Sequence, residues 1–180
     1  MQPILQILQD KLNKRIEEGL YRELKDYSAF CDFSSNDYLG FSRDQKELTQ
    51  FGSTGSRLIS GNSADIERLE SEIANFHQAE SGLIFNSGYV ANLGLFSTIP
   101  NRGDTVLYDE LIHASIRDGI RLSNADSFSF KHNDVEHLEG KLSKFKGNVF
   151  VVVESVYSMD GDSPDLLKVS EACRNFGANL

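Results

Sequence analysis

The sequence predicts an α/β fold built around a largely parallel sheet. Short apolar segments that are typical of strands alternate with longer segments whose apolar side chains recur at helical spacing. The most apolar short segment, residues 149–153, reads Val-Phe-Val-Val-Val, as expected for a strand that is buried on both faces of a sheet. Strands that are joined by helices in this order form parallel sheets, which places the fold in the α/β class.

The predicted elements begin with a helix in which leucine or isoleucine recurs every four residues from Leu8 to Leu24. We expect residues 1–40 to hold this helix and an extended segment, and residues 41–180 to form the N-terminal part of a larger domain. The other expected elements are an extended segment at 27–33, helices at 43–51, 66–76, 88–99, 111–122, 135–145 and 166–176, and strands at 82–85, 105–108, 127–130 and 149–153.

The last four residues are expected to end a helix and to begin a further strand. Gly177 is typical of a helix stop, and residues 178–180 resemble the start of a further strand. We therefore expect the chain to be a fragment of its domain, in which the strand at 149–153 lacks one neighbour.

Charge and cysteine content exclude several classes of protein. The 180 residues contain 27 acidic and 18 basic side chains, a net charge of -9, which argues against binding to nucleic acid or to an anionic membrane surface. No apolar run approaches the roughly 18 residues that a membrane span needs. Cys31 and Cys173 are too few for a disulfide framework, which favours a cytoplasmic protein.

Polar segments follow three of the predicted strands, where open α/β sheets bind their ligands. Residues 86–89 combine Gly88 with the start of a helix, which suits either a phosphate or an ordinary tight turn. In the second segment, His113 either stacks on a planar ligand or exchanges protons, or it is a packing residue. In the third, residues 154–162, Ser158 is placed to donate to a ligand oxygen, although Asp160-Gly161 is also a plain turn signal.

Other chemistry finds little support in the sequence. The glycine-rich dinucleotide fingerprint, the Walker phosphate loop and the nucleophile elbow of hydrolases are all missing from it. His132 and His137 are five residues apart and point in different directions on a helix, so we expect no metal site from this pair.

Taken together, the motifs resemble the α-oxoamine synthase family of pyridoxal-phosphate (PLP) enzymes. The resemblance extends from about residue 30 to the end, with the motifs in the family's order and spacing. The six matching stretches are residues 35–40 (SNDYLG), 52–57 (GSTGSR), 87–92 (SGYVAN), 113–116 (HASI), 132–134 (HND) and 158–162 (SMDGD).

The resemblance implies a fold and a PLP site. The fold is the three-layer α/β/α architecture of fold type I, like the large domain of aspartate aminotransferase, here in truncated form. The amides of Gly88 and Tyr89 would bind the cofactor phosphate, and His113 would stack on the pyridine ring. Ser158 would bond to the ring hydroxyl of the cofactor, and Asn36 would hold the substrate carboxylate.

Further implications concern the assembly. Glu154 would orient its neighbours, and residues 52–57 would lie near the active site of a partner subunit in a homodimer. Ile66 departs from the histidine that many members carry at this position, which weakens the assignment to one branch but not the chemistry.

The resemblance also implies a reaction: an amino acid condenses with an acyl thioester, and CoA and carbon dioxide are lost. The Ser-Met-Asp-Gly-Asp motif favours the branch that makes 8-amino-7-oxononanoate for biotin from L-alanine and pimeloyl-CoA or a pimeloyl-carrier protein. Branches that use glycine or serine as donor stay open, and so does a noncatalytic fragment.

The lysine chemistry of the family is expected to lie beyond Leu180. None of the nine lysines stands in the Ser-Lys-Ala context of the family's Schiff-base lysine. We therefore expect the 180-residue chain alone to be inactive.

Overall fold

A computed structural model describes residues 3–21, 39, 55–58 and 61–180. The chain divides into two compact units, Met1–Gly52 and Ser53–Leu180. The expected extended segment at 27–33, the expected helix at 43–51 and the expected boundary after residue 40 lie outside the described residues.

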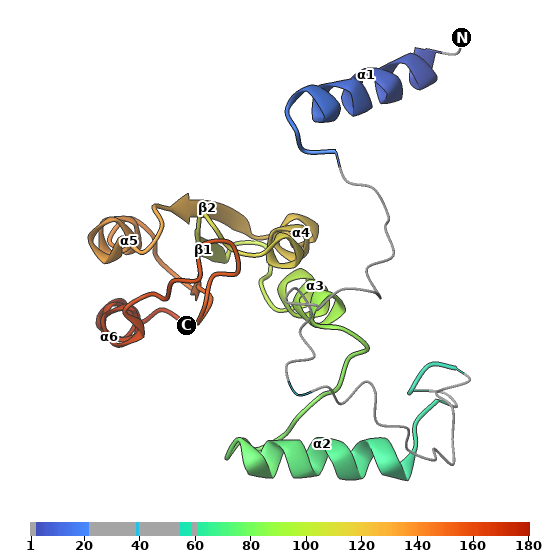
Figure 1. Cartoon of the computed structure of the whole chain (residues 1–180). Coiled ribbons are helices and arrows are strands. Elements are labelled where there is room, and N and C mark those ends of the chain that lie inside the picture. The colour runs from blue at the N-terminus through green and yellow to red at the C-terminus, as the bar shows by residue number, and fades with distance from the viewer. Residues whose placement is uncertain (1–2, 22–38, 40–54, 59–60) are drawn as a thin grey trace. The chain divides into compact units, whose positions relative to one another are not determined.

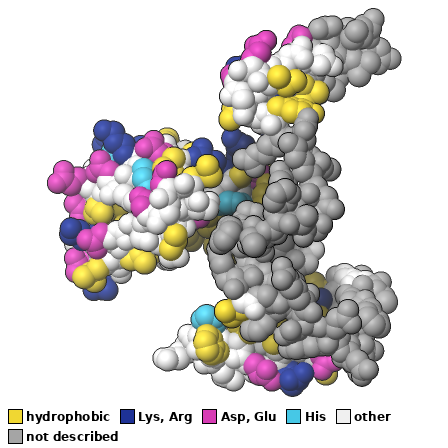
Figure 2. Space-filling view, viewed as in Figure 1, with side chains coloured by type: hydrophobic (Ala, Val, Ile, Leu, Met, Phe, Trp, Pro, Cys, Tyr) yellow, Lys and Arg dark blue, Asp and Glu magenta, His cyan; other side chains and the backbone are white. Residues whose placement is uncertain are grey.

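The first helix, α1, spans Pro3–Glu17 and is shorter than the leucine pattern predicts. Gly19 adopts a left-handed φ of 68°, and the amide of Leu20 donates to the carbonyl of Arg15 at 2.8 Å. This glycine-based stop ends the helix before Leu20, because few residues other than glycine adopt that φ without strain. Figure 2 shows hydrophobic side chains on the visible surface of this unit, in which Ile16 is 55% exposed.

A three-stranded parallel sheet forms the centre of the second unit (Figure 1). Its strands are β1 (Thr105–Asp109), β2 (Asp126–Phe130) and β3 (Val149–Val152), in the order β2-β1-β3. Leu107 of β1 lies opposite Phe128 of β2 and Val151 of β3. The predicted α/β class with a parallel sheet is confirmed.

Helices cover both faces of this sheet. Neighbouring residues of β1 point to opposite faces, so each packs against a different set of helices. Leu107 packs in a buried cluster with Leu138 of α5 (Val135–Leu142) and Val169 of α6 (Leu166–Phe176). Val106 packs instead with Ile116 of α4 (Ala114–Leu122). The result is the expected α/β/α layering.

Two further helices precede the sheet. Ser63 caps α2 (Ala64–Phe76), and Ser87 caps α3 (Gly88–Thr98). Helix α3 packs closely on α4, since a Cβ added at Gly119 would lie 2.8 Å from the Cβ of Phe96 and 2.9 Å from the carbonyl oxygen of Asn92. Gly119 is therefore required for this close approach of the two helices.

The strand predicted at 82–85 is not formed, and this prediction is wrong. Leu83 is 66% exposed, and the amide of Ile84 donates to the carboxylate of Glu70 at 2.9 Å instead of to a strand. A strand needs the backbone of a neighbour, and no described segment pairs with these residues.

The helix predicted from residue 111 begins three residues later. The amide of Leu111 donates to Oδ1 of Asp109 at 2.9 Å, which turns the chain directly after β1. His113 then caps α4 by accepting the amide proton of Ser115 on its Nδ1 atom.

The C-terminal residues follow the prediction for a helix stop and a new strand. Gly177 ends α6 with a φ of 67°, and Asn179 forms a parallel bridge with Phe150. The amide of Val151 donates to the carbonyl of Asn179 at 2.7 Å. The expectation that the strand at 149–153 lacks one neighbour therefore needs correction, because Asn179 occupies part of its second edge.

Candidate functional site

The polar segments after β1, β2 and β3 meet at the carboxyl edge of the sheet. Hydrogen bonds connect Asp109 at the end of β1 with His132 after β2, and Glu154 after β3 with His113 after β1. This is the edge at which parallel α/β sheets bind ligands.

The ring of His113 is held in one orientation. Its Nδ1 atom accepts the amide proton of Ser115 at 3.2 Å and lies 2.7 Å from the Ser115 hydroxyl oxygen. Ser115 is fully buried, and the side-chain amide of Asn92 donates to its hydroxyl at 3.0 Å. Because Nδ1 is an acceptor here, a neutral His113 carries its proton on Nε2, which has no partner among the described residues.

Glu154 and Tyr89 approach His113 from other elements. The backbone amide of His113 donates to Oε1 of Glu154, which ties the segment after β1 to the segment after β3. The rings of Tyr89 and His113 meet edge to face with their centroids 6.2 Å apart. The Tyr89 hydroxyl donates to Asp118, and this bond, followed by burial, raises the pKa of Tyr89.

The start of α3 offers unpaired amides. The hydroxyl of Ser87 accepts the amide proton of Val90 at 3.2 Å, and its backbone carbonyl accepts that of Ala91 at 3.0 Å. The amides of Gly88 and Tyr89 have no acceptor among the described residues, and a Cβ added at Gly88 would meet nothing within 4 Å. An anion such as a phosphate group fits this open helix N-terminus, where a side chain would otherwise stand.

Ser158 lies in a closed turn after β3, and its side chain is exposed. The amide of Tyr157 donates to the carbonyl of Asp162 at 2.9 Å, and the amide of Gly161 donates to the carbonyl of Tyr157 at 2.8 Å. Asn36, the expected ligand of the substrate carboxylate, lies outside the described residues.

Sequence reasoning missed the roles of Asp109 and Asp162. The side chain of Asp109 is fully buried, and its carboxylate binds Nδ1 of His132 and the amide of Asn133, each at 2.9 Å. Asp162 binds the other ring nitrogen of His132. The signal that could have found them is an acidic residue directly after the strand at 105–108, together with a His-Asn-Asp motif that had no assigned role.

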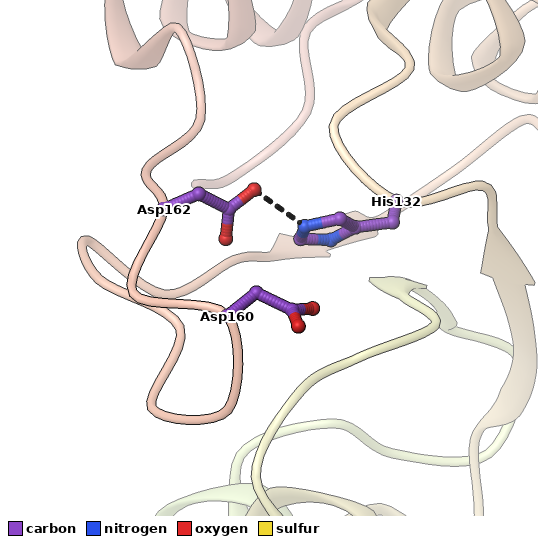
Figure 3. A group of neighbouring side chains, drawn as sticks. All are labelled: His132, Asp160 and Asp162. Carbon is purple, nitrogen blue, oxygen red and sulfur yellow. Dashed lines mark hydrogen bonds and ion pairs between the residues drawn. The ribbon is translucent and has the colours of Figure 1, made fainter.

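His132 and His137 do not share a site. Nδ1 of His137 accepts the amide proton of Lys131 at 3.0 Å, whereas both nitrogens of His132 face carboxylates. Among the described residues, one group of side chains is spaced so that it could hold a cation, namely His132, Asp160 and Asp162 (Figure 3).

Arg57, expected near the site of a partner subunit, is engaged within its own chain. Its guanidinium binds both carboxylate oxygens of Glu70, at 2.5 and 3.0 Å. This bond raises the pKa of Arg57 and lowers that of Glu70.

Among the helices of the described residues, none has the length and apolar character of a membrane span.

Curated proteins from other organisms are similar to the chain in sequence. An 8-amino-7-oxononanoate synthase from Emericella nidulans is 44% identical, over 86% of this chain and 44% of its own length. The chain spans about half the length of the curated relatives it matches.

Solved structures of two named enzymes are similar to the chain in fold. A serine palmitoyltransferase from S. paucimobilis with a bound PLP–myriocin aldimine has a TM-score of 0.68 and 36% identity, covering 71% of this chain and 32% of its own. An 8-amino-7-oxononanoate synthase from Francisella tularensis has a TM-score of 0.56 and 30% identity, covering 74% of this chain and 35% of its own. These names agree with the resemblance to the α-oxoamine synthases, and the fold type I prediction is confirmed.

The sequence pattern of the family described as Aminotransferase class I and II matches residues 29–178, which is most of the chain. The chain therefore belongs to the aminotransferase class I and II family.

Proposed function

We propose that the protein carrying this chain is a PLP-dependent α-oxoamine synthase. It joins L-alanine to pimeloyl-CoA or a pimeloyl-carrier protein with loss of carbon dioxide, and so makes 8-amino-7-oxononanoate for biotin in the cytoplasm, as a homodimer. The observation that carries the proposal is the meeting of His113, Glu154 and the free amides of α3 at one sheet edge. Relatives and solved structures with this name support the choice of reaction.

The N-terminus of α3 binds the cofactor phosphate in this proposal. The amides of Gly88 and Tyr89 point away from the helix with no acceptor among the described residues, and the positive end of the helix dipole favours an anion there. The bare Gly88 lets the phosphate approach the backbone closely.

His113 stacks on the pyridine ring and remains a proton carrier. Ser115 binds the Nδ1 atom of the ring, and Glu154 binds the backbone amide of His113. The two bonds restrict rotation of the side chain and so fix the direction of the ring face. Nε2 is then the atom at which a proton is exchanged with the substrate. Ser158 donates to the ring hydroxyl of the cofactor, and Asn36 binds the carboxylate of the amino acid.

PLP held by these residues would supply an electron sink that activates the α-carbon of the amino acid toward the acyl thioester. The chain's own residues contribute orientation and the proton at His113. Residues 1–180 by themselves lack the family's Ser-Lys-Ala motif, so we expect them to be inactive alone.

A substrate comparison tests the reaction. The purified protein, loaded with PLP, is given alanine with pimeloyl-CoA, glycine with acetyl-CoA, or serine with palmitoyl-CoA. We expect free CoA to appear fastest with the first pair, and mass spectrometry to find 8-amino-7-oxononanoate. Faster turnover of another pair would move the protein to another branch, and no turnover of any pair would favour a noncatalytic role.

His113→Ala tests the site itself. We expect it to shift the absorption band of bound PLP and to lower turnover, while the melting temperature stays near that of the unchanged protein. The matched control is His77→Ala, because His77 is an exposed residue at the end of α2. A loss of melting temperature with normal turnover per folded molecule would show that His113 is a packing residue.

Residues 1–180 can be tested separately. The purified piece is mixed with PLP, reduced with borohydride and digested for mass spectrometry. We expect scattered, substoichiometric labelling of surface lysines and no condensation activity. A single labelled lysine accompanied by condensation of alanine with an acyl thioester would contradict this expectation.

A further inference from the structure

His132 lies between the carboxylates of Asp109 and Asp162, and Figure 3 shows its hydrogen bond to Asp162. Its Nδ1 atom is 2.9 Å from Oδ1 of Asp109, and its Nε2 atom is 2.9 Å from Oδ2 of Asp162. Asp109 ends β1, whereas Asp162 belongs to the turn after β3. The ring therefore joins the central strand of the described sheet to that turn.

The Asp109 end of this bridge is rigid. Its carboxylate is fully buried, and the amides of Leu111 and Asn133 both donate to it at 2.9 Å. With these bonds and the bond to His132, Asp109 is fixed in place relative to the sheet. Asn133 reaches its position through a left-handed φ of 55°, which asparagine tolerates better than most residues.

The charge of the bridge follows from the donors available. An ionised carboxylate only accepts hydrogen bonds, and an imidazole ring has two N–H groups only when it is protonated. A neutral His132 could donate to one of the two carboxylates and would turn a lone pair toward the other. The side-chain nitrogen of Asn133 also lies 3.1 Å from Nε2, and it donates to Oδ2 of Asp162 at 2.7 Å. A ring that donates to both carboxylates is therefore an imidazolium.

The surroundings favour this protonated ring. Burial by itself lowers the pKa of His132, but the hydrogen bonds to Asp109 and Asp162 outweigh burial and raise it. The carboxylate of Glu110 accepts the backbone amide of His132 at 3.0 Å. The other titratable groups that face the ring are Asp160, and Tyr157 at a ring-centroid distance of 4.6 Å.

The far end of the bridge controls a short turn. The carbonyl of Asp162 accepts the amide of Tyr157, which closes residues 157–162 on themselves. The buried ring of Tyr157 stands at right angles to the ring of His132. His132 thus contacts both ends of the turn, and Ser158 lies between those ends.

We propose that His132 is a positioning residue that, as an imidazolium between Asp109 and Asp162, clamps the turn at 157–162 and so holds Ser158 in place. The link to catalysis rests on the proposed role of Ser158 toward PLP, whereas the clamp itself does not. Asn133 makes a parallel link, because its side-chain amide donates to Oδ2 of Asp162 at 2.7 Å and its backbone amide donates to Oδ2 of Asp109 at 2.9 Å.

A divalent cation is the rival occupant of the space beside Asp162. His132, Asp160 and Asp162 offer ligand atoms within 4.8 Å of one another, and Oδ1 of Asp162 is buried without a hydrogen-bond partner among the described residues. The direct 2.9 Å contact between the ring nitrogen and Asp162 favours a proton, and Asp160 is exposed. Binding of a cation at this position is one of the outcomes that the experiment below distinguishes.

Nuclear magnetic resonance of the histidine rings tests the clamp directly. The sequence has only four histidines, so His132→Gln assigns the resonance of His132 in the whole protein. We expect His132 to titrate at a higher pH than a free histidine, and Asp162→Asn to lower its midpoint by about 1 unit or more through loss of the adjacent charge. Asp160→Asn is the matched control, since Asp160 carries the same charge in the same turn but makes no hydrogen bond to the ring.

The catalytic consequence is a pH profile. We expect kcat to fall as the pH rises through the midpoint of His132, and this fall to occur at lower pH in Asp162→Asn than in Asp160→Asn. The absorption band of bound PLP is expected to shift over the same pH range, with little change in KM for the acyl thioester. Melting temperatures of all variants show whether they fold.

Each outcome decides the proposal. A midpoint of His132 that stays at the free value, or that Asp162→Asn leaves unchanged, would overturn the clamp. If the titration of His132 disappears on addition of Zn²⁺, a metal occupies the place of the proton, and this result would also overturn the clamp. The expected midpoints without any effect on the PLP band would leave the clamp standing and refute the role of Ser158 in the proposed function.

Discussion

Residues 149–152 and residues 82–85 are both short apolar segments before a polar segment, yet only the first is a strand. Val151 and Val152 in β3 are 3% and 6% exposed, and backbone bonds run from β3 to β1 and to Asn179. Leu83 and Phe85 are 66% and 39% exposed, with no paired backbone in the described chain. The difference teaches that apolar content makes a strand only where a neighbouring backbone is present.

The helices beside these segments differ in the same way. Helix α4 has four buried residues, whereas α3 has none and leaves Leu95 half exposed. The sheet region is therefore stabilised by packing on both faces, and the 82–98 region depends on its contact with α4. Substitutions in the two regions should have very different costs.

The largest expected effect is in the sheet. Leu107→Ala should lower the free energy of unfolding by about 2–5 kcal/mol, because it leaves a cavity at a fully buried position. Leu83→Ala is the matched control, and its change should stay within about 0.5 kcal/mol. Urea unfolding of both variants measures the difference, and similar losses for the two would remove the distinction between the regions.

The contact between α3 and α4 should be the next most sensitive. Gly119→Ala should cost about 1–3 kcal/mol, because the new Cβ would press against the backbone of Asn92 and the side chain of Phe96. Gly140→Ala in α5 meets nothing within 4 Å and should instead stabilise the protein by about 0.5–1 kcal/mol. Thermal unfolding distinguishes them by sign, and two changes of the same sign would contradict the close approach of the helices.

The pH dependence of stability follows from His132 and adds to these packing effects. Its folded pKa is raised, so the bridge to Asp109 and Asp162 contributes fully below the unfolded value of about 6.5. That contribution is lost as the pH rises through the folded pKa. Unfolding free energies measured across this range should fall with pH in the unchanged protein and fall less in His132→Gln.

Much of the fold was predictable because the signals are local. The helical spacing of residues 66–76 and 166–176 and the apolar run at 149–153 depend on a few adjacent residues, and each became the expected element. The failures depend on partners. The stop at Gly19 depends on a left-handed backbone, and a strand at 82–85 would need another chain segment beside it.

The candidate site divides along the same line. His113 and Gly88 could be proposed from the sequence because they stand in motifs at the ends of predicted elements. The bridge through His132 was missed, since Asp109 and Asp162 are 53 positions apart in the numbering and are joined only by the fold. Sequence spacing alone does not reveal that one ring contacts both.

The smallest expected effect on stability, with a clear effect on binding, is at Gly88. A Cβ added there would meet nothing within 4 Å, so we expect Gly88→Val to change the free energy of unfolding by less than about 1 kcal/mol. If the amides of Gly88 and Tyr89 bind the cofactor phosphate, the branched side chain would block the approach of the phosphate. The loss in PLP binding should be roughly the 1.5–3 kcal/mol of a hydrogen bond to a charged group. That corresponds to about a tenfold to hundredfold higher Kd, which an absorbance titration with PLP measures.

Gly140→Val is the control, because it makes the same change on the exposed surface of α5 and should leave the Kd unchanged. An equal Kd in the two variants would show that the open start of α3 is an ordinary turn, and the difference between the two regions would then be one of packing alone.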